Sequence, residues 1–198
     1  MDEVKDSTLY YDQNATSFIE NTLSVDMSDL YQHFLPLLPC RALILDAGCG
    51  SGRDSKFFID SGYRVTAIDA CRELAKSTEK LISQPVQVAY FQNFSSDKKF
   101  DAIWACASLL HVPSQELPNV FQRFSNLLKS SGVLYCSFKY GTNDIVRNHR
   151  LFVNANQERL QTFIQATPLT IQKVWLTNDQ RSSRNQEQWL IAILVKGI

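Results

Sequence analysis

The segment Leu43–Arg53, which reads LILDAGCGSGR, constrains the fold of this chain more than any other. It begins within the apolar run Ala42–Leu45, which is short and continuous, as is typical of a strand buried on both faces of a parallel sheet. Three glycines then alternate with other residues in the following turn. Glycines there let the backbone approach another group closely, and the next helix supplies free N–H donors. The pattern predicts a strand, a turn and a helix at the start of an α/β fold.

The spacing of the glycines narrows the choice of ligand. In Gly48-x-Gly50-x-Gly52, Arg53 stands where the dinucleotide fingerprint has its last glycine, and the GK[ST] ending of a phosphate loop is absent. Asp69 follows about 20 residues after the first glycine, where a carboxylate accepts hydrogen bonds from both hydroxyls of a ribose. The alternatives are a helix N-cap at Asp69 and an Asx turn at Asp46. Taken together, the turn and the acid predict a nucleoside-binding site.

The rest of the chain alternates between strand and helix patterns, which predicts a mostly parallel sheet with helices on both faces. The last two strands follow each other without a helix and are expected to pair antiparallel. Residues 1–8 are expected to be a frayed tail, and the polar stretch Tyr140–Arg150 has no predicted element. The expected strands are Ala42–Leu45, Arg64–Ile68, Val86–Phe91, Phe100–Ala105, Val133–Lys139, Leu169–Thr177 and Gln188–Val195. The expected helices are one or two in Asp12–Phe34, broken around Ser24–Ser28, and then Arg53–Ser61, Glu73–Ser83, Ser114–Lys129 and Asn156–Thr167.

Composition excludes several classes of protein. The 198 residues carry 20 Lys+Arg and 20 Asp+Glu, so the net charge is zero, which argues against a nucleic-acid or anionic-membrane partner. No apolar run approaches the roughly 20 residues that span a bilayer, and the acidic, polar start is unlike a signal peptide. We expect one soluble, cytoplasmic domain. The five cysteines form no CxxC pair, so neither a disulfide framework nor a metal site is expected.

Four segments carry a family resemblance: LDAGCGSGRDS, VTAID, FDAIWACASLLHV and LLKSSGVLYCSFK. In order, they resemble the motifs of class I S-adenosylmethionine (SAM)-dependent methyltransferases over nearly the whole chain. Within that superfamily, the GSGRDS turn and the short chain resemble small bacterial tellurite-resistance-like methyltransferases. The resemblance implies a Rossmann-like, doubly wound sheet of seven strands, mostly parallel with the last strand antiparallel. Residues 1–40 would form an N-terminal helical cap and residues 41–198 the Rossmann-like core of a single domain.

The resemblance also implies which residues bind SAM and its product, S-adenosylhomocysteine. The glycine turn would surround the methionine half, Asp69 would hold the ribose, and the segment after the third strand would flank the adenine, with Asn93 in place of the usual acid. Arg53 would pair with the methionine carboxylate or face solvent. The expected cofactor-binding residues are Asp46, Gly48, Cys49, Gly50, Gly52, Arg53, Asp69, Ala70, Cys71, Asn93, Phe94 and Ala105.

The acceptor is expected beyond the carboxyl ends of the parallel strands, where ligands bind in open α/β sheets. His111 is the candidate general base, because histidine titrates near neutral pH; a structural histidine is the alternative. Arginines in the late loops favour a small anionic or zwitterionic acceptor, although charged loops are also often simply solvated. The expected substrate-binding residues are Tyr11, Lys139, Arg147, Arg150, Arg181 and Arg184.

Two other functions compete with small-molecule methylation. A nucleic-acid methyltransferase, for example of tRNA, is disfavoured because Trp104–Ser108 lacks the Pro-Pro-aromatic motif of amino-methylating enzymes. A SAM-binding protein without turnover is the second alternative. Nitrogen, oxygen, sulfur and metalloid acceptors are all compatible with these residues.

Overall fold

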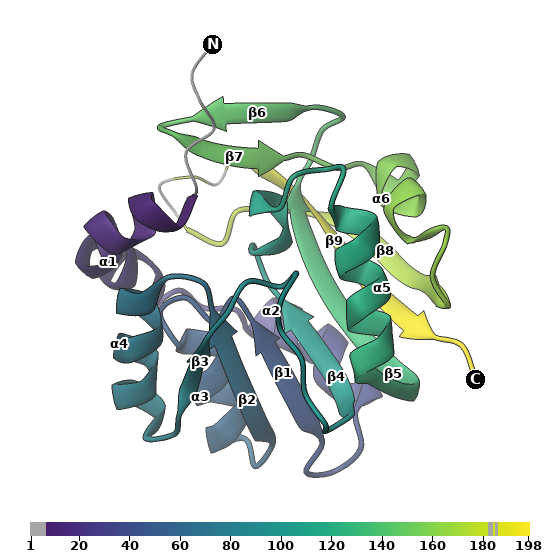
Figure 1. Ribbon diagram of the computed structural model, residues 1–198, viewed down its shortest axis with the longest axis horizontal. Coiled ribbons are helices and arrows are strands. Elements are labelled where there is room, and N and C mark those ends of the chain that lie inside the picture. Colours follow the sequence, from purple (N-terminus) through teal and green to yellow (C-terminus); the bar gives the residue numbers. More distant parts are fainter. Residues whose placement is uncertain (1–6, 182–183, 185) are drawn as a thin grey trace.

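A seven-stranded sheet forms the centre of the molecule, in the order β3-β2-β1-β4-β5-β9-β8 (Figure 1). The structure is a computed structural model that describes residues 7–181, 184 and 186–198. Strand β9 runs antiparallel to both of its neighbours, β5 and β8, while β3, β2, β1, β4 and β5 pair parallel. This confirms the predicted Rossmann-like sheet. The strands of the sheet are β1 (Leu43–Ala47), β2 (Arg64–Asp69), β3 (Val86–Val88), β4 (Phe100–Ala105), β5 (Leu128–Lys139), β8 (Leu169–Asn178) and β9 (Gln188–Lys196).

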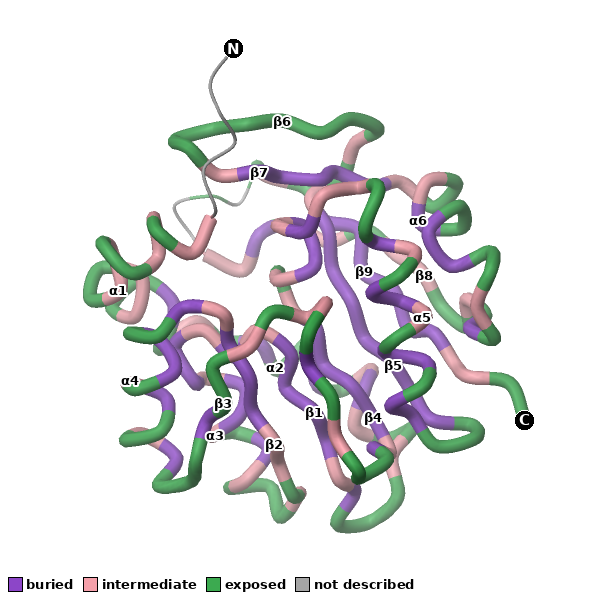
Figure 2. The backbone as a smooth tube through the Cα atoms, in the orientation of Figure 1, coloured by how far each residue is buried: buried purple, intermediate pink, exposed green. Residues whose placement is uncertain are grey.

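Helices cover both faces of the sheet. In Figure 1, α5 and α6 lie in front of the strands, and α2 and α3 lie behind them. Strands β1 and β4 are buried along most of their length, as is the second half of β5 (Figure 2). Behind the sheet, the rings of Trp104 and Tyr135 stack with centroids 3.8 Å apart, and Phe34 packs against Trp104 at 4.9 Å. The helices are α2 (Ser28–Phe34), α3 (Arg53–Asp60), α4 (Arg72–Ile82), α5 (Leu117–Leu127) and α6 (Gln157–Ile164), with short 3-10 turns η1 (Leu35–Leu37) and η2 (Leu109–His111).

The N-terminal region contains two helices, with the predicted break between them. Helix α1 (Ser7–Thr22) is followed by an irregular segment and then by α2. Within α1 the backbone of Asn14 departs from helical geometry (φ −119°, ψ 17°), so the helix is kinked there. Ser7 and Thr8 already belong to α1, which corrects the expected tail at these positions; residues 1–6 lie outside the described part. Helix α1 packs against α4 and β7.

A β-hairpin occupies the polar stretch for which no element was predicted. Strands β6 (Asp144–Arg147) and β7 (Arg150–Val153) pair antiparallel. Asn148 and His149 join them with φ of 51° and 59°, and two central residues with positive φ are the requirement of a type I′ turn. The expected loop was wrong because this turn contains no glycine to signal it. The hairpin lies beyond the carboxyl end of the sheet (Figure 1).

Two strand boundaries differ from expectation by three residues or more. Strand β3 ends at Val88, because the chain turns immediately afterwards, with Tyr90 accepting from the backbone of Asn93 and Phe94. Strand β5 begins at Leu128 and runs through the expected turn at Ser131-Gly132, where its register against β4 shifts. Among the described residues, no helix is long and apolar enough to cross a membrane.

Candidate functional site

The glycine turn connects β1 to α3, bonds to the end of β2, and is contacted by two other segments. The backbone N–H groups of Gly48 and Cys49 both donate to the carbonyl of Ile68, at 2.9 and 3.0 Å. Gly48 has a φ of +84°, and a Cβ there would lie 2.5 Å from the Cβ of Ser108, just before η2. A Cβ on Gly50 would lie 3.2 Å from the ring of Phe18 in α1. The missing side chains therefore let η2 and α1 close over this turn.

Asp69, at the end of β2, holds the turn from the other side. Its two carboxylate oxygens accept from the N–H of Gly50 and of Cys71, each at 2.8 Å. Burial raises the pKa of Asp69 to about 6. A carboxylate has about four lone-pair sites, so each oxygen keeps acceptor capacity beyond these two bonds. The N-cap of α4 is Cys71, whose Sγ accepts from the N–H of Leu74, so the N-cap alternative for Asp69 is wrong.

Asp46 at the end of β1 is almost completely buried and faces the start of α3. Its carboxylate accepts a hydrogen bond of 2.6 Å from the hydroxyl of Ser55, which makes it a link to α3 rather than an Asx turn. Burial, followed by the charge of nearby Asp54, raises the pKa of Asp46 to about 8. Its predicted contact with the cofactor stays a prediction.

Arg53 forms a buried ion pair with its neighbour Asp54, at 2.7 Å between Nε and Oδ1. Asp54 also accepts from the hydroxyl of Tyr31 at 2.5 Å and from the indole Nε1 of Trp104 at 2.8 Å. Burial acts to raise the pKa of Asp54, but the charge and hydrogen bonds of Arg53 outweigh it and hold that pKa below its usual value. The solvent-facing alternative for Arg53 is therefore wrong.

The orientation of Arg53 follows from this cluster. Its Nη2 donates to Asp54 at 2.9 Å and its Nη1 contacts the carbonyl of Thr22 at 3.4 Å. Since each Nη atom carries two N–H groups, both keep one N–H beyond these contacts. Asp54 was not predicted as a site residue, because its partners Tyr31 and Trp104 are 23 and 50 residues away and no local pattern links them.

The remaining expected cofactor residues differ in how much surface they present. Asn93 is exposed and Ala70 is half-buried. Phe94 is 1% exposed, so its ring packs into the core and offers no surface to an adenine in this arrangement. Its role beside the adenine stays a prediction, and only the backbone of Phe94 could make that contact. The expected residues that are buried in the same way are Cys49, Cys71 and Ala105.

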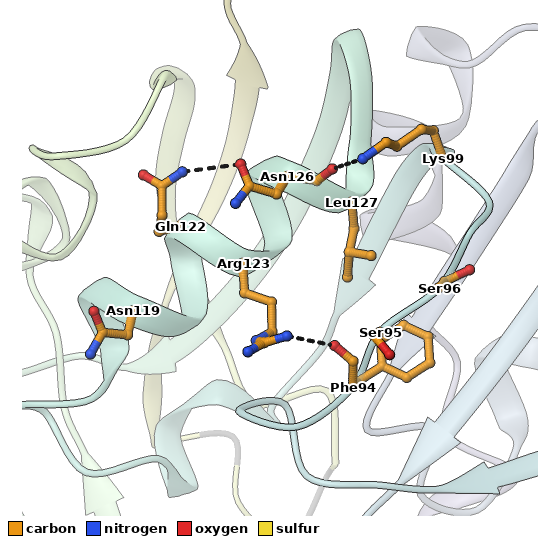
Figure 3. A pocket seen from close by; sticks show the side chains of 9 residues that line it. All are labelled: Phe94, Ser95, Ser96, Lys99, Asn119, Gln122, Arg123, Asn126 and Leu127. Carbon is orange, nitrogen blue, oxygen red and sulfur yellow. Dashed lines mark hydrogen bonds between the residues drawn. The ribbon is translucent and has the colours of Figure 1, made fainter.

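A groove lies between the segment after Phe94 and helix α5 (Figure 3). Arg123 donates to the carbonyl of Phe94 at 3.2 Å, and Lys99 donates to the carbonyl of Asn126 at 2.5 Å. These contacts tie the loop to α5. Arg123 and Lys99 thus hold the loop against α5. The groove therefore adds no candidate residue for binding the cofactor or the acceptor. Among the described residues no group of three His, Cys, Asp or Glu is placed to hold a metal ion.

His111 and Tyr11 meet on the acceptor side. The Nδ1 of His111 lies 2.7 Å from the carbonyl of Leu151, and its Nε2 lies 2.8 Å from the Tyr11 hydroxyl. A carbonyl only accepts, so Nδ1 carries the proton and the Nε2 of a neutral His111 accepts from Tyr11. Burial first, helped by the charges of Arg150 and Lys139, lowers the pKa of His111 to about 4. Burial also raises the pKa of Tyr11.

Arg150, the first residue of β7, lies among aromatic rings. Its Cζ is 3.9 Å from the centroid of Tyr10, 5.0 Å from that of Phe152 and 5.6 Å from that of Tyr11. Its Nη1 contacts the Tyr11 hydroxyl at 3.4 Å. Its Nε is buried without a hydrogen-bond partner, and no carboxylate in residues 7–181, 184 and 186–198 forms an ion pair with it.

The other expected substrate-binding residues separate into two groups. Lys139 is paired with Glu187 at 2.6 Å, and Arg181 forms a two-point ion pair with Asp179. Arg147 on β6 and Arg184 after β8 are exposed. The structure thus brings Tyr11, His111 and Arg150 together, and the Nζ of Lys139 lies 5.0 Å from the ring centroid of Phe152, which Arg150 also contacts. It leaves Arg147 and Arg184 on the surface. Phe152 was not predicted, because no sequence motif marks it.

The sheet order and the turn after β1 define a Rossmann-like fold. Residues 44–132 match the family model described as "Methyltransferase domain". A ubiquinone biosynthesis O-methyltransferase of Xanthomonas axonopodis pv. citri (strain 306) is 32% identical over 108 residues, 51% of this chain and 44% of that protein. The chain therefore spans less than half of the length of that relative.

Two solved structures share the fold over most of the chain. The 1,6-didemethyltoxoflavin-N1-methyltransferase of Burkholderia thailandensis, with 1,6-didemethyltoxoflavin and S-adenosylhomocysteine bound, superposes with a TM-score of 0.78 at 19% identity, covering 98% of this chain and 88% of that one. A SAM-dependent methyltransferase from Methanosarcina mazei gives 0.75 at 19% identity, covering 85% and 98%. At these identities the likeness concerns the fold alone.

Proposed function

We propose that this chain is a SAM-dependent methyltransferase that transfers a methyl group to a small molecule and releases S-adenosylhomocysteine. The observation that carries the proposal is the pairing of Asp69 with the glycine turn through Gly50. In this pairing the Asp69 carboxylate keeps free lone pairs, and it lies beside a turn whose backbone a ligand can approach closely. The match of residues 44–132 to a methyltransferase domain and the fold shared with SAM-dependent enzymes support it.

The residues present fit the cofactor by their donor and acceptor chemistry. Asp69 would accept from the ribose hydroxyls. Arg53, held by Asp54, would direct its remaining N–H groups to the carboxylate, since arginine binds carboxylates through paired donors. When bound, the cofactor supplies an electrophilic methyl group on a positively charged sulfur. The protein contributes positioning, exclusion of water and removal of a proton from the acceptor.

The acceptor side supports a small anionic or zwitterionic molecule. Arg150 is the cation there that has no ion-pair partner among the described residues, whereas Lys139 and Arg181 are neutralised by their own acids. His111 would act as the general base through Nε2. The resemblance to tellurite-resistance-like methyltransferases stays part of this proposal and rests on the GSGRDS turn and the short chain.

Calorimetry with SAM and S-adenosylhomocysteine tests the cofactor site. Asp69→Asn should weaken binding of both at least about tenfold, because an amide is a poorer partner for two hydroxyl donors. The matched control is Asp101→Asn. Asp101 also accepts a backbone N–H, from Leu43, but it lies near the start of β4, whereas Asp69 lies at the carboxyl end of β2. Equal affinities in wild type and Asp69→Asn would remove the ribose assignment.

A second assay addresses turnover. Release of S-adenosylhomocysteine is measured with hydroxyl, amine, thiol, carboxylate and metalloid oxyanion acceptors, and with tRNA. Turnover with one of the small molecules is the expected result. A strong preference for tRNA would favour the nucleic-acid alternative. Tight SAM binding without turnover on any acceptor would favour a binding protein.

A further inference from the structure

We propose that the groove between the loop after Phe94 and helix α5 binds the phosphate group of a small organic phosphate ester. Such a site is independent of the proposed methyl transfer. The groove has a volume of about 330 Å³ and is lined by cations, amides and hydroxyls, with no carboxylate among the residues that line it. Its volume falls at the lower end of the range for small-molecule sites, so it has room for more than a bare ion.

The groove lies toward the amino ends of two strands of the sheet. Lys99 comes just before β4, and Leu127 comes just before β5. Both strands run parallel to β1, and the glycine turn follows the carboxyl end of β1. The groove is therefore distinct from the site built on Asp69 and the glycine turn.

Two cations line the groove without an acid to neutralise them. Lys99 comes from the loop and Arg123 from α5 (Figure 3). Their hydrogen bonds go to the backbone carbonyls of Asn126 and Phe94, and neither cation forms an ion pair in the part of the chain that the structure describes. A carbonyl carries no net charge, so both positive charges remain. A phosphate monoester, with a charge of about −1.5 to −2 at pH 7, complements them.

The lining side chains have more donors than their own contacts use. Lys99 carries three N–H groups and Arg123 five, and each uses one for a backbone carbonyl. Asn126 accepts a side-chain hydrogen bond through Oδ1, so its amide nitrogen keeps two N–H groups. Ser96 accepts from the N–H of Lys98, so its hydroxyl proton is left for another acceptor. Phosphate oxygens are strong acceptors and match this surplus of donors.

Helix α5 presents its polar groups to the groove as one stripe. Residues at positions i, i+3, i+4 and i+7 lie on one face of a helix, and here they are Asn119, Gln122, Arg123 and Asn126. Donors from both the helix and the loop can surround a group with three oxygens, whereas a planar carboxylate offers two. A nucleic acid is disfavoured, because the groove supplies two cations and the chain has no net charge.

Calorimetry tests the site on the full chain, with S-adenosylhomocysteine present in excess so that the probes do not compete for the cofactor side. The probes are glucose 6-phosphate and glycerol 3-phosphate, and the comparisons are inorganic phosphate, glucose and tRNA. We expect both esters to bind at least about threefold more tightly than inorganic phosphate, because the groove contacts the rest of the ester as well. Glucose should not bind.

Lys99→Gln removes one of the two cations and should weaken binding of both esters about tenfold. The matched control is Lys98→Gln, which makes the same change of charge at the neighbouring position, outside the residues that line the groove. Its ester affinity should equal that of wild type.

A second variant keeps the test valid if the loss of Lys99 loosens the loop. Asn119 lies in the first turn of α5, where an acidic side chain favours the helix. Asn119→Asp should therefore fold normally, but it adds a negative charge to the groove and should weaken ester binding at least about tenfold. Asn119→Ala adds no charge and should change the affinity less than about threefold.

Three results would overturn the proposal: no binding of either ester, equal affinities for the esters and inorganic phosphate, or ester affinities that neither Lys99→Gln nor Asn119→Asp changes. Binding of tRNA without binding of the esters would also overturn it. The affinity for S-adenosylhomocysteine should stay unchanged in these variants, and a parallel loss would show that they act through the fold. Failure of wild type to bind S-adenosylhomocysteine would reject the proposed function, while leaving the ester measurements to decide this site.

Discussion

The hydroxyl of Tyr11 lies 2.8 Å from Nε2 of His111, although the two residues are 100 positions apart in the chain. Tyr11 comes from α1, His111 ends η2, and the other ring nitrogen of His111 contacts the carbonyl of Leu151 in β7. One imidazole therefore ties three segments together above the carboxyl end of the sheet. This contact makes the stability of that region sensitive to the protonation of His111.

The free energy of unfolding should decrease as the pH is lowered, because His111 is held neutral in the folded protein. Its pKa in the folded state is about 4, below the ordinary value, so it is neutral when folded. In the unfolded chain it takes up a proton as the pH drops through roughly 6.5. Its contribution is thus fully present above about pH 6.5 and is lost progressively between that pH and about 4. Urea unfolding of wild type and His111→Gln measures this.

The expected pattern is a stability difference between wild type and His111→Gln that is largest above neutral pH and shrinks on acidification. If the two proteins lost stability in parallel from neutral to acid pH, His111 would not be held neutral by the fold. The measurement concerns stability alone, so it is independent of the identity of the acceptor.

Gly48→Ala should both destabilise the fold and disturb the site. The added Cβ would lie 2.5 Å from the Cβ of Ser108, at a position with a φ of +84°. Gly62→Ala is a matched control, because Gly62 has a φ of +86° but nothing within 4 Å of its Cβ position. Left-handed backbone alone costs an alanine about 1–2 kcal/mol.

We expect Gly62→Ala to lose about that amount in urea unfolding and to bind SAM normally. Gly48→Ala should lose more and should also bind SAM weakly, since Ser108 must shift. Equal losses in the two variants, with normal SAM binding in both, would show that the contact between Gly48 and Ser108 is easily relieved.

Asp54→Asn should be strongly destabilising. The carboxylate accepts from Arg53, Tyr31 and Trp104, and an amide cannot accept from all of these donors or neutralise Arg53. Removing one partner of a buried ion pair typically costs about 3–5 kcal/mol. Asp60→Asn, which breaks the exposed ion pair with Lys56, is the control and should change stability little.

Chemical unfolding measures both variants of this pair, and calorimetry with SAM shows whether the loss of Asp54 also releases Arg53. A folded Asp54→Asn protein with unchanged SAM affinity would mean that Asp54 serves the core alone. An effect no larger than that of Asp60→Asn on unfolding would contradict the buried cluster.

Much of the fold was predictable, because local patterns report it. The apolar run Leu43–Leu45 and the glycines after it mark a buried strand and a tight turn wherever they occur. The β6–β7 hairpin escaped prediction because Asn148 and His149 adopt positive φ without a glycine. The end of β3 at Val88 depends on a turn around Tyr90 that apolar periodicity does not reveal.

The candidate site was predictable only in part. Asp69 was expected beside the glycine turn from its spacing, and the structure joins it to Gly50. By contrast, Arg53 was predicted without its partner Asp54. Of the six residues expected to bind the substrate, the structure brings Tyr11 and Arg150 together with His111, the candidate base. Charge alone does not reveal which cations are already neutralised, as Lys139 is by Glu187.

The sequence by itself determined the strand–turn–helix with its glycines, the alternation of strands and helices, and the acid after the second strand. These features depend on backbone conformations and on periodic burial, which neighbouring residues specify. Only the tertiary structure decided that Asp54 meets Trp104 and that Tyr11 meets His111 and Arg150. Those partners lie 50 to 139 residues apart, so their contacts exist only once the sheet, α1 and the β6–β7 hairpin have packed together.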